Sequence, residues 1–175
     1  MWLPVQLHHH AWVTRDQRAT RAFYQDVVGL PLIATWTETG PLMGEGEQAY
    51  CHTLYGLGDG SGLAFFQFAD DEFASRHAPT PPDCPFRHLA LLVDEPTQAA
   101  IGERAAGAGL APALVDHGYC RSLYLTDPNG LRLELAVDHP HIDEINACRR
   151  ASAHHDLRRW LDGDHTNNNE WRPLS

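Results

Sequence analysis

The sequence lacks the features of nucleic-acid binding, secretion and membrane insertion. Its 175 residues carry a formal net charge of -10, without a run of Lys or Arg that could bind nucleic acid or anionic lipid. No segment is apolar for long enough to cross a bilayer. The first residues, MWLPVQL, lack the charged and apolar parts of a signal peptide. These absences predict a cytoplasmic protein that binds neither nucleic acid nor a membrane.

Cysteine pairs at redox or metal-binding spacing are also lacking. The cysteines are scattered, with no C-x-x-C pair and no zinc-like spacing: Cys51, Cys84, Cys120 and Cys148. We therefore expect reduced thiols, as is usual in the cytoplasm. Hydrophobic residues make up 43% and charged residues 21% of the chain, which is typical of a globular protein with a substantial core.

What the sequence does contain is one pattern of elements that occurs twice. The first copy reads as strand, helix and three strands, in the segments VQLHHHAWV, DQRATRAFYQDVVGL, LPLIATWTE, QAYCHTLYGLG and GLAFFQFAD. Its helix has Asp16 as a suitable N-cap and Gly29 at its end. The second copy has the same order, in FRHLALLVD, EPTQAAIGERAAGAGL, APALVD, CRSLYLTD and GLRLELAVD. The turn sequence DPNG separates its last two strands.

This repeat predicts an α+β fold of two tandem βαβββ modules, which form a curved eight-stranded mixed sheet around a shared cleft. We expect module one at about residues 5–70 and module two at about 85–138, within a domain of residues 1–140. The proline-containing segment DDEFASRHAPTPPDC is expected to link the modules. Residues 141–175 are predicted to form an amphipathic helix, DEINACRRASAHHDLRRWL, and a polar, irregular tail.

Aligning the two copies selects three residues. With GLAFFQFAD set over GLRLELAVD, Phe66 falls on Glu134, and with LHHHAWV set over FRHLALL, His9 falls on His88. Side chains alternate between the two faces of a strand, and the leucines beside Glu134 belong under the helices. His9, His88 and Glu134 are therefore predicted to face the cleft, whereas His10 shares the helix side.

Two imidazoles and one carboxylate are the facial triad that holds a divalent metal and leaves positions open for substrate and dioxygen. The fourth position related by the repeat is Phe66, which cannot ligate a metal. Phe66 and Phe68 are instead expected to form an apolar wall suited to an aromatic ring. His117 and Tyr119, on an expected loop at the cleft mouth, are candidates for a proton shuttle and a substrate contact.

The chain resembles the vicinal oxygen chelate superfamily of glyoxalases, extradiol dioxygenases and antibiotic-binding proteins. The residues that carry this resemblance are LHHHAWVTRDQRATRAFYQDVVGL, FRHLALLVDE and YLTDPNGLRLELAVD. It implies the same three ligands, His9, His88 and Glu134. It also implies a catalytic tyrosine, because Tyr124 stands ten residues before Glu134 as in extradiol enzymes. Homodimers are frequent in this superfamily, and the C-terminal helix is a candidate interface element or lid.

The resulting hypothesis is a dioxygenase that binds Fe(II), with Mn(II) or another divalent metal as the alternative. It would cleave a small catecholic or hydroquinone-like substrate by extradiol chemistry. One alternative is a metal-dependent lyase or isomerase of the glyoxalase type, which would need a fourth ligand or a base such as His52 or Gln67. The other is a metal-free protein that sequesters a small aromatic compound.

Overall fold

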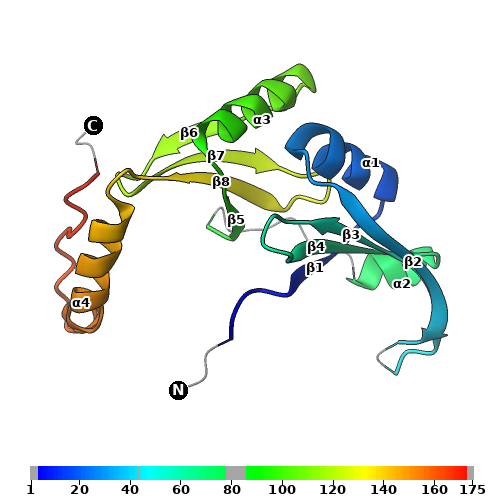
Figure 1. Ribbon diagram of the computed structural model, residues 1–175. Helices are drawn as coiled ribbons and strands as arrows, with labels where there is room; N and C mark the ends of the chain where they lie inside the picture. The colour runs from blue at the N-terminus through cyan, green and yellow to red at the C-terminus, as the bar shows by residue number, and fades with distance from the viewer. Residues whose placement is uncertain (1–3, 43, 78–85, 173–175) are drawn as a thin grey trace.

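A computed structural model describes residues 4–42, 44–77 and 86–172, and it contains both predicted modules (Figure 1). Module one consists of β1(His9–Val13), α1(Gln17–Arg21), η1(Ala22–Val28), β2(Leu32–Pro41), β3(Glu47–Gly56) and β4(Gly62–Phe68). Module two consists of β5(His88–Leu92), α3(Glu95–Gly107), β6(Ala113–Asp116), β7(Cys120–Thr126) and β8(Arg132–Asp138). The tandem βαβββ arrangement is therefore confirmed.

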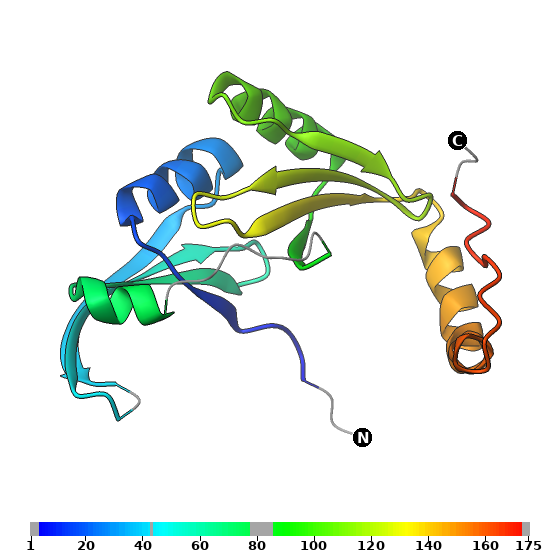
Figure 2. The ribbon, with the colours of Figure 1, turned by 180° about the vertical axis from the view of Figure 1, so that it is seen from behind.

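The eight strands are divided between two four-stranded mixed sheets. Sheet one has the strand order β1-β4-β3-β2, and sheet two has the order β5-β8-β7-β6. In each sheet the first strand runs parallel to the last strand of its module, and the other pairs are antiparallel. The two sheets of the described chain remain separate and do not close around one cleft (Figure 2).

The register of the parallel pair differs between the modules. Val13 lies opposite Phe66 in sheet one, whereas Ala90 lies opposite Glu134 in sheet two. Since the sequence repeat aligns Ala11 with Ala90, β1 is shifted along its partner by two residues relative to β5. Side chains alternate with a period of two, so this shift keeps every residue on its predicted face.

The first helix begins where the sequence predicts, but it continues as a wider π-helix. The side chain of Asp16 accepts hydrogen bonds from the backbone N–H groups of Arg18 and Ala19, as an N-cap should. After α1 the chain forms the π-helix η1, which ends at Gly29 with a left-handed φ of 94°. The guanidinium of Arg104 in α3 donates to the carbonyls of Val27 and Val28 at 2.7 and 3.2 Å. These bonds satisfy carbonyl groups at the end of η1 and tie it to module two.

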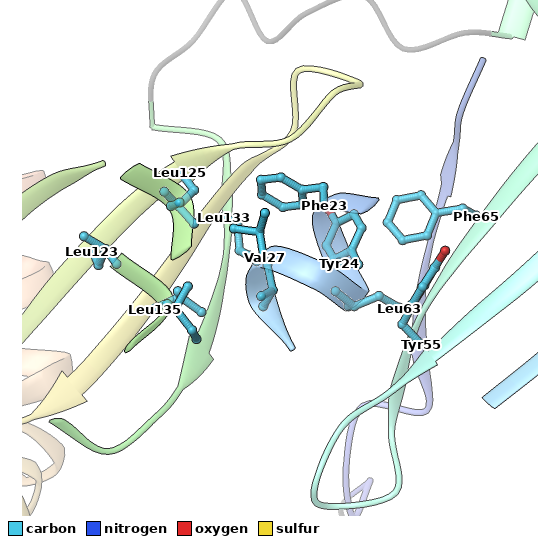
Figure 3. Close-up of a cluster of buried hydrophobic side chains, with 13 residues drawn as sticks. Phe23, Tyr24, Val27, Tyr55, Leu63, Phe65, Leu123, Leu125, Leu133 and Leu135 are labelled. Atoms are coloured by element: carbon cyan, nitrogen blue, oxygen red, sulfur yellow. The ribbon is translucent and has the colours of Figure 1, made fainter. Parts of the chain in front are cut away.

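One hydrophobic core serves both sheets (Figure 3). Tyr24 of η1 is fully buried, and its ring packs against Phe65 of sheet one. The same cluster of buried side chains includes the leucines of sheet two. The Tyr24 hydroxyl donates to Asp127 in the DPNG turn of module two at 3.0 Å. Each sheet thus uses its helix-covered face for the shared core and leaves the other face open. We call these the open faces of sheet one and sheet two.

Two further helices lie outside the modules. The segment predicted as the linker begins with a helix, α2(Asp71–His77), and Asp70 just before it accepts a hydrogen bond from the Phe73 N–H at 2.8 Å. The prolines of that linker lie outside the described residues. The predicted C-terminal helix is confirmed as α4(Ile142–Leu161), followed by an irregular tail. Among the described helices, none is both long and apolar enough for a membrane span.

Candidate active site on the open faces

Two of the predicted ligands meet on the open face of sheet two. Leu133 and Leu135 point into the core, so Glu134 between them projects from the opposite face of β8. The Nε2 atom of His88, on the neighbouring parallel strand β5, lies 2.8 Å from Oε2 of Glu134. Glu134 is only 6% exposed, although it lies on the face opposite the core. The pair is therefore a partly dehydrated imidazole–carboxylate contact.

The hydrogen bonds made by the other atoms of His88 and Glu134 leave the pair ready to bind a cation. The Nδ1 atom of His88 lies 2.9 Å from the carbonyl of Phe86, and because a carbonyl can only accept, Nδ1 carries a proton. In a neutral ring the lone pair of Nε2 would then face a carboxylate oxygen, unless a proton or a metal ion lies between them. The second oxygen of Glu134 accepts a hydrogen bond from the Ser122 hydroxyl at 2.5 Å. In metal sites, hydrogen bonds of this kind to the ligands' other atoms hold the ligands in position. His88 and Glu134 therefore fit two ligands of a divalent metal.

Tyr124 and His117 adjoin this pair. Tyr124 on β7 lies directly opposite Glu134, and its hydroxyl is hydrogen-bonded to Nε2 of His117 at 2.9 Å. The guanidinium carbon of Arg132 lies 4.4 Å from the centre of the Tyr124 ring. Burial, together with the charge of Glu134, raises the pKa of the Tyr124 phenol above its ordinary value. The phenol is therefore a neutral hydrogen-bond donor at physiological pH.

His9 lies on the other sheet. It projects from the open face of sheet one, and its Nδ1 atom lies 2.7 Å from Nδ1 of His8. In the described part of the chain, no three His, Cys, Asp or Glu side chains are grouped so that they could hold one metal ion. The structure thus brings His88 and Glu134 together within one chain and does not bring His9 to them.

The open face of sheet one is aromatic. We call its ring-bearing residues the aromatic face: Trp36, Tyr50, His52, Phe66 and Phe68. The rings of His52 and Phe66 are stacked with centroids 3.9 Å apart, and those of Phe66 and Phe68 are parallel at 6.4 Å. Trp36, at the outer strand, is 44% exposed. A shallow pocket beside β1 is lined by Ala11, Trp12, Val13, Phe66 and His77.

The other residues proposed from the sequence lie in different places. His52 lies on the aromatic face, where burial and then the His9 imidazole lower its pKa. Gln67 points to the helix side, where its side-chain oxygen accepts from the Gln17 N–H at 2.9 Å, so it does not reach an open face. Tyr119 is 45% exposed, and its ring stacks on His117 with centroids 6.0 Å apart. Its expected contact with substrate stays a prediction.

Sequence reasoning did not reach every residue around the site. Ser122 precedes Tyr124 by two residues on β7, so alternation puts both on one face, but its bond to Glu134 is a finding of the structure. Asn169 and Trp171 of the tail could not have been found, because no periodicity connects the tail with the loop that it contacts.

The sequence profile of the Glyoxalase/Bleomycin resistance protein/Dioxygenase superfamily matches residues 6–135. The chain belongs to this superfamily. No curated protein matches it. Among solved structures it is similar to "Oxidase ChaP-H2", with 26% identity and a TM-score of 0.53, covering 78% of this chain and 96% of the other.

Two further solved structures share the fold at lower identity. A mutant of the fosfomycin resistance protein FosX from Listeria monocytogenes, complexed with Mn(II) and a dihydroxypropylphosphonic acid, is 15% identical, with a TM-score of 0.54 and coverage of 76% and 92%. The trypanothione-dependent glyoxalase I of Leishmania major is 14% identical, with a TM-score of 0.60 and coverage of 86% and 99%.

Proposed function

We propose that this protein is a metal-dependent dioxygenase that cleaves a small catecholic or hydroquinone-like aromatic substrate. The observation that carries the proposal is the His88–Glu134 pair, with its outer atoms already hydrogen-bonded and a neutral tyrosine beside it. The similarity to a protein named as an oxidase, at 26% identity, supports oxidative chemistry. Fe(II) is the metal that best suits a facial triad of this type, with Mn(II) as the alternative.

The third ligand, His9, comes from a second copy of the chain. Both sheets use their helix-covered faces in one shared core, so the two open faces of one chain cannot face each other without disrupting that core. In a twofold dimer, the open face of sheet one can cover the open face of sheet two in the partner. This places the partner's His9 and aromatic face opposite His88 and Glu134, and it generates two equivalent sites.

The chain's own residues then have distinct tasks. The aromatic face packs against the substrate ring and excludes water from it. Tyr124 donates a hydrogen bond to a substrate oxygen, and His117 exchanges a proton with the Tyr124 hydroxyl through Nε2. Fe(II) bound at the triad would supply the redox chemistry through which dioxygen and the phenolic substrate react.

Metal analysis and oxygen uptake test this proposal. Protein purified without air is expected to contain iron at about one equivalent per chain and to consume oxygen with catechols or hydroquinones. Protein without a bound divalent metal, or with metal but no oxygen uptake on any such substrate, would contradict it.

A glyoxalase-type activity is the second candidate, and His52 favours it. Its Nε2 atom is buried and has no hydrogen-bond partner among the described residues, on the same open face as His9. His52 is therefore placed to serve as a further ligand or base. Turnover of a hemithioacetal of methylglyoxal without oxygen consumption would favour this activity over the dioxygenase.

A further inference from the structure

The C-terminal tail lies on the loop that carries His117. The side-chain amide of Asn169 donates a hydrogen bond to the His117 carbonyl at 3.0 Å. The neighbouring Gly118 has a φ of +85°, which favours glycine, and a Cβ atom there would collide with the backbone of Trp171. The tail backbone therefore rests directly on the loop between β6 and β7.

The tail is itself held in place from two other sides. The ring of Trp171 contacts those of His139 and His141, with centroids 5.2 and 6.4 Å apart. The guanidinium of Arg149 in α4 donates to the carbonyl of Asn168 at 2.6 Å. Figure 1 shows the tail running alongside α4, next to the ends of the sheet-two strands. The contact between Asn169 and the loop is thus part of a fixed arrangement.

The residue that the tail fixes is also the one that contacts Tyr124. The His117 N–H donates to the carbonyl of Cys120 at 2.9 Å, and Asp116 accepts from the Gly118 N–H at 2.7 Å. These bonds shape the turn, and the carbonyl of Tyr119 ties it to the residue after β8 by accepting from the His139 N–H at 3.0 Å. Asn169 adds a second anchor, and this one acts on the carbonyl of the same residue whose imidazole is hydrogen-bonded to the Tyr124 hydroxyl.

We infer that Asn169 is a positioning residue, which acts through His117 to hold the imidazole against the Tyr124 hydroxyl. The tail lies beyond residues 6–135, which the superfamily profile matches. The effect on catalysis rests on the proposed function, whereas the effect on the position of His117 does not.

The test compares Asn169→Ala with Glu170→Ala, the adjacent tail residue, which is exposed. Imidazole nitrogen and proton signals are recorded for the whole protein, and those of His117 are assigned among the 12 histidines with His117→Gln. Asn169→Ala is expected to shift the His117 ring signals toward those seen in Tyr124→Phe, and Glu170→Ala to leave them unchanged. In an active enzyme, Asn169→Ala should lower kcat about tenfold with KM unchanged.

Asn169→Asp is a second variant, because it keeps the side-chain shape while removing the donor. Unchanged His117 signals in both Asn169 variants would overturn the inference, even if the enzyme is an active dioxygenase. Conversely, shifted His117 signals in a protein that never consumes oxygen would uphold the positioning role while the proposed function fails.

Discussion

Sheet one and sheet two are built from the same module, yet their open faces carry different chemistry. Phe66 in β4 and Glu134 in β8 occupy positions that the sequence repeat aligns. Phe66 stacks on His52 among other rings, whereas Glu134 is bonded to His88 and Ser122. The buried faces, in contrast, are apolar in both modules and share one core. The helix-covered faces are alike because both pack into one core, whereas the open faces differ: one is an aromatic surface and the other holds a polar site.

The largest expected effect comes from removing the carboxylate of sheet two. Glu134→Ala should lose the bound metal and lower turnover by at least about 10³-fold, because the imidazoles of His88 and of His9 from the second copy cannot hold the ion without the carboxylate. The matched control is Glu38→Ala, a carboxylate on the open face of sheet one that accepts from the Tyr50 hydroxyl at 3.0 Å. It should keep the metal. Elemental analysis measures the metal content of both variants. Equal metal content would contradict the claim that only the open face of sheet two supplies the carboxylate ligand.

A smaller loss is expected when the donor next to the carboxylate is removed. Tyr124→Phe keeps the ring over which Arg132 lies but removes the hydroxyl bonded to His117. Metal content should stay at the wild-type level, while kcat should fall about 10²-fold, as for loss of a general acid. Steady-state kinetics on metal-loaded protein measure this, and an unchanged kcat would exclude Tyr124 from the reaction.

The aromatic face should affect binding more than chemistry. Phe66→Ala removes the ring between His52 and Phe68, and KM should rise about tenfold with metal content unchanged. The same kinetics test it. A fall in kcat at constant KM would mean that sheet one contributes to the chemical step.

The smallest effect concerns the link between the two modules, which does not involve the open faces. Burial raises the pKa of Asp127, so the folded protein binds this proton more tightly than the unfolded chain. The contribution of this group to stability is therefore present at low pH and is lost as pH rises through its folded pKa. Relative to Asp127→Asn, the wild type should gain stability as pH falls from 7 toward 4 in urea unfolding. A difference independent of pH would contradict this account.

Much of the fold, but less of the site, follows from the sequence. Asp16, Gly29 and the alternation around Glu134 are local signals, and local signals predict elements and faces well. No local pattern predicted the π-helix η1 after α1, nor the hydrogen bond from Arg104 of module two to the carbonyl of Val27 at its end. Alternation placed His9, His88 and Glu134 on open faces correctly. It could not tell whether the two open faces meet within one chain, because this depends on how the helices pack.

The central claim, that two copies of the chain complete each metal site, is tested most directly by mixing two inactive variants. His9→Ala and Glu134→Ala should each bind almost no metal alone. When they are unfolded and refolded together, half of the dimers should be mixed, and each mixed dimer regains one intact site, so metal content and oxygen uptake should return to about a quarter of the wild-type level. No recovery in the mixture, with wild-type protein refolding and binding metal under the same conditions, would contradict a site shared between two chains.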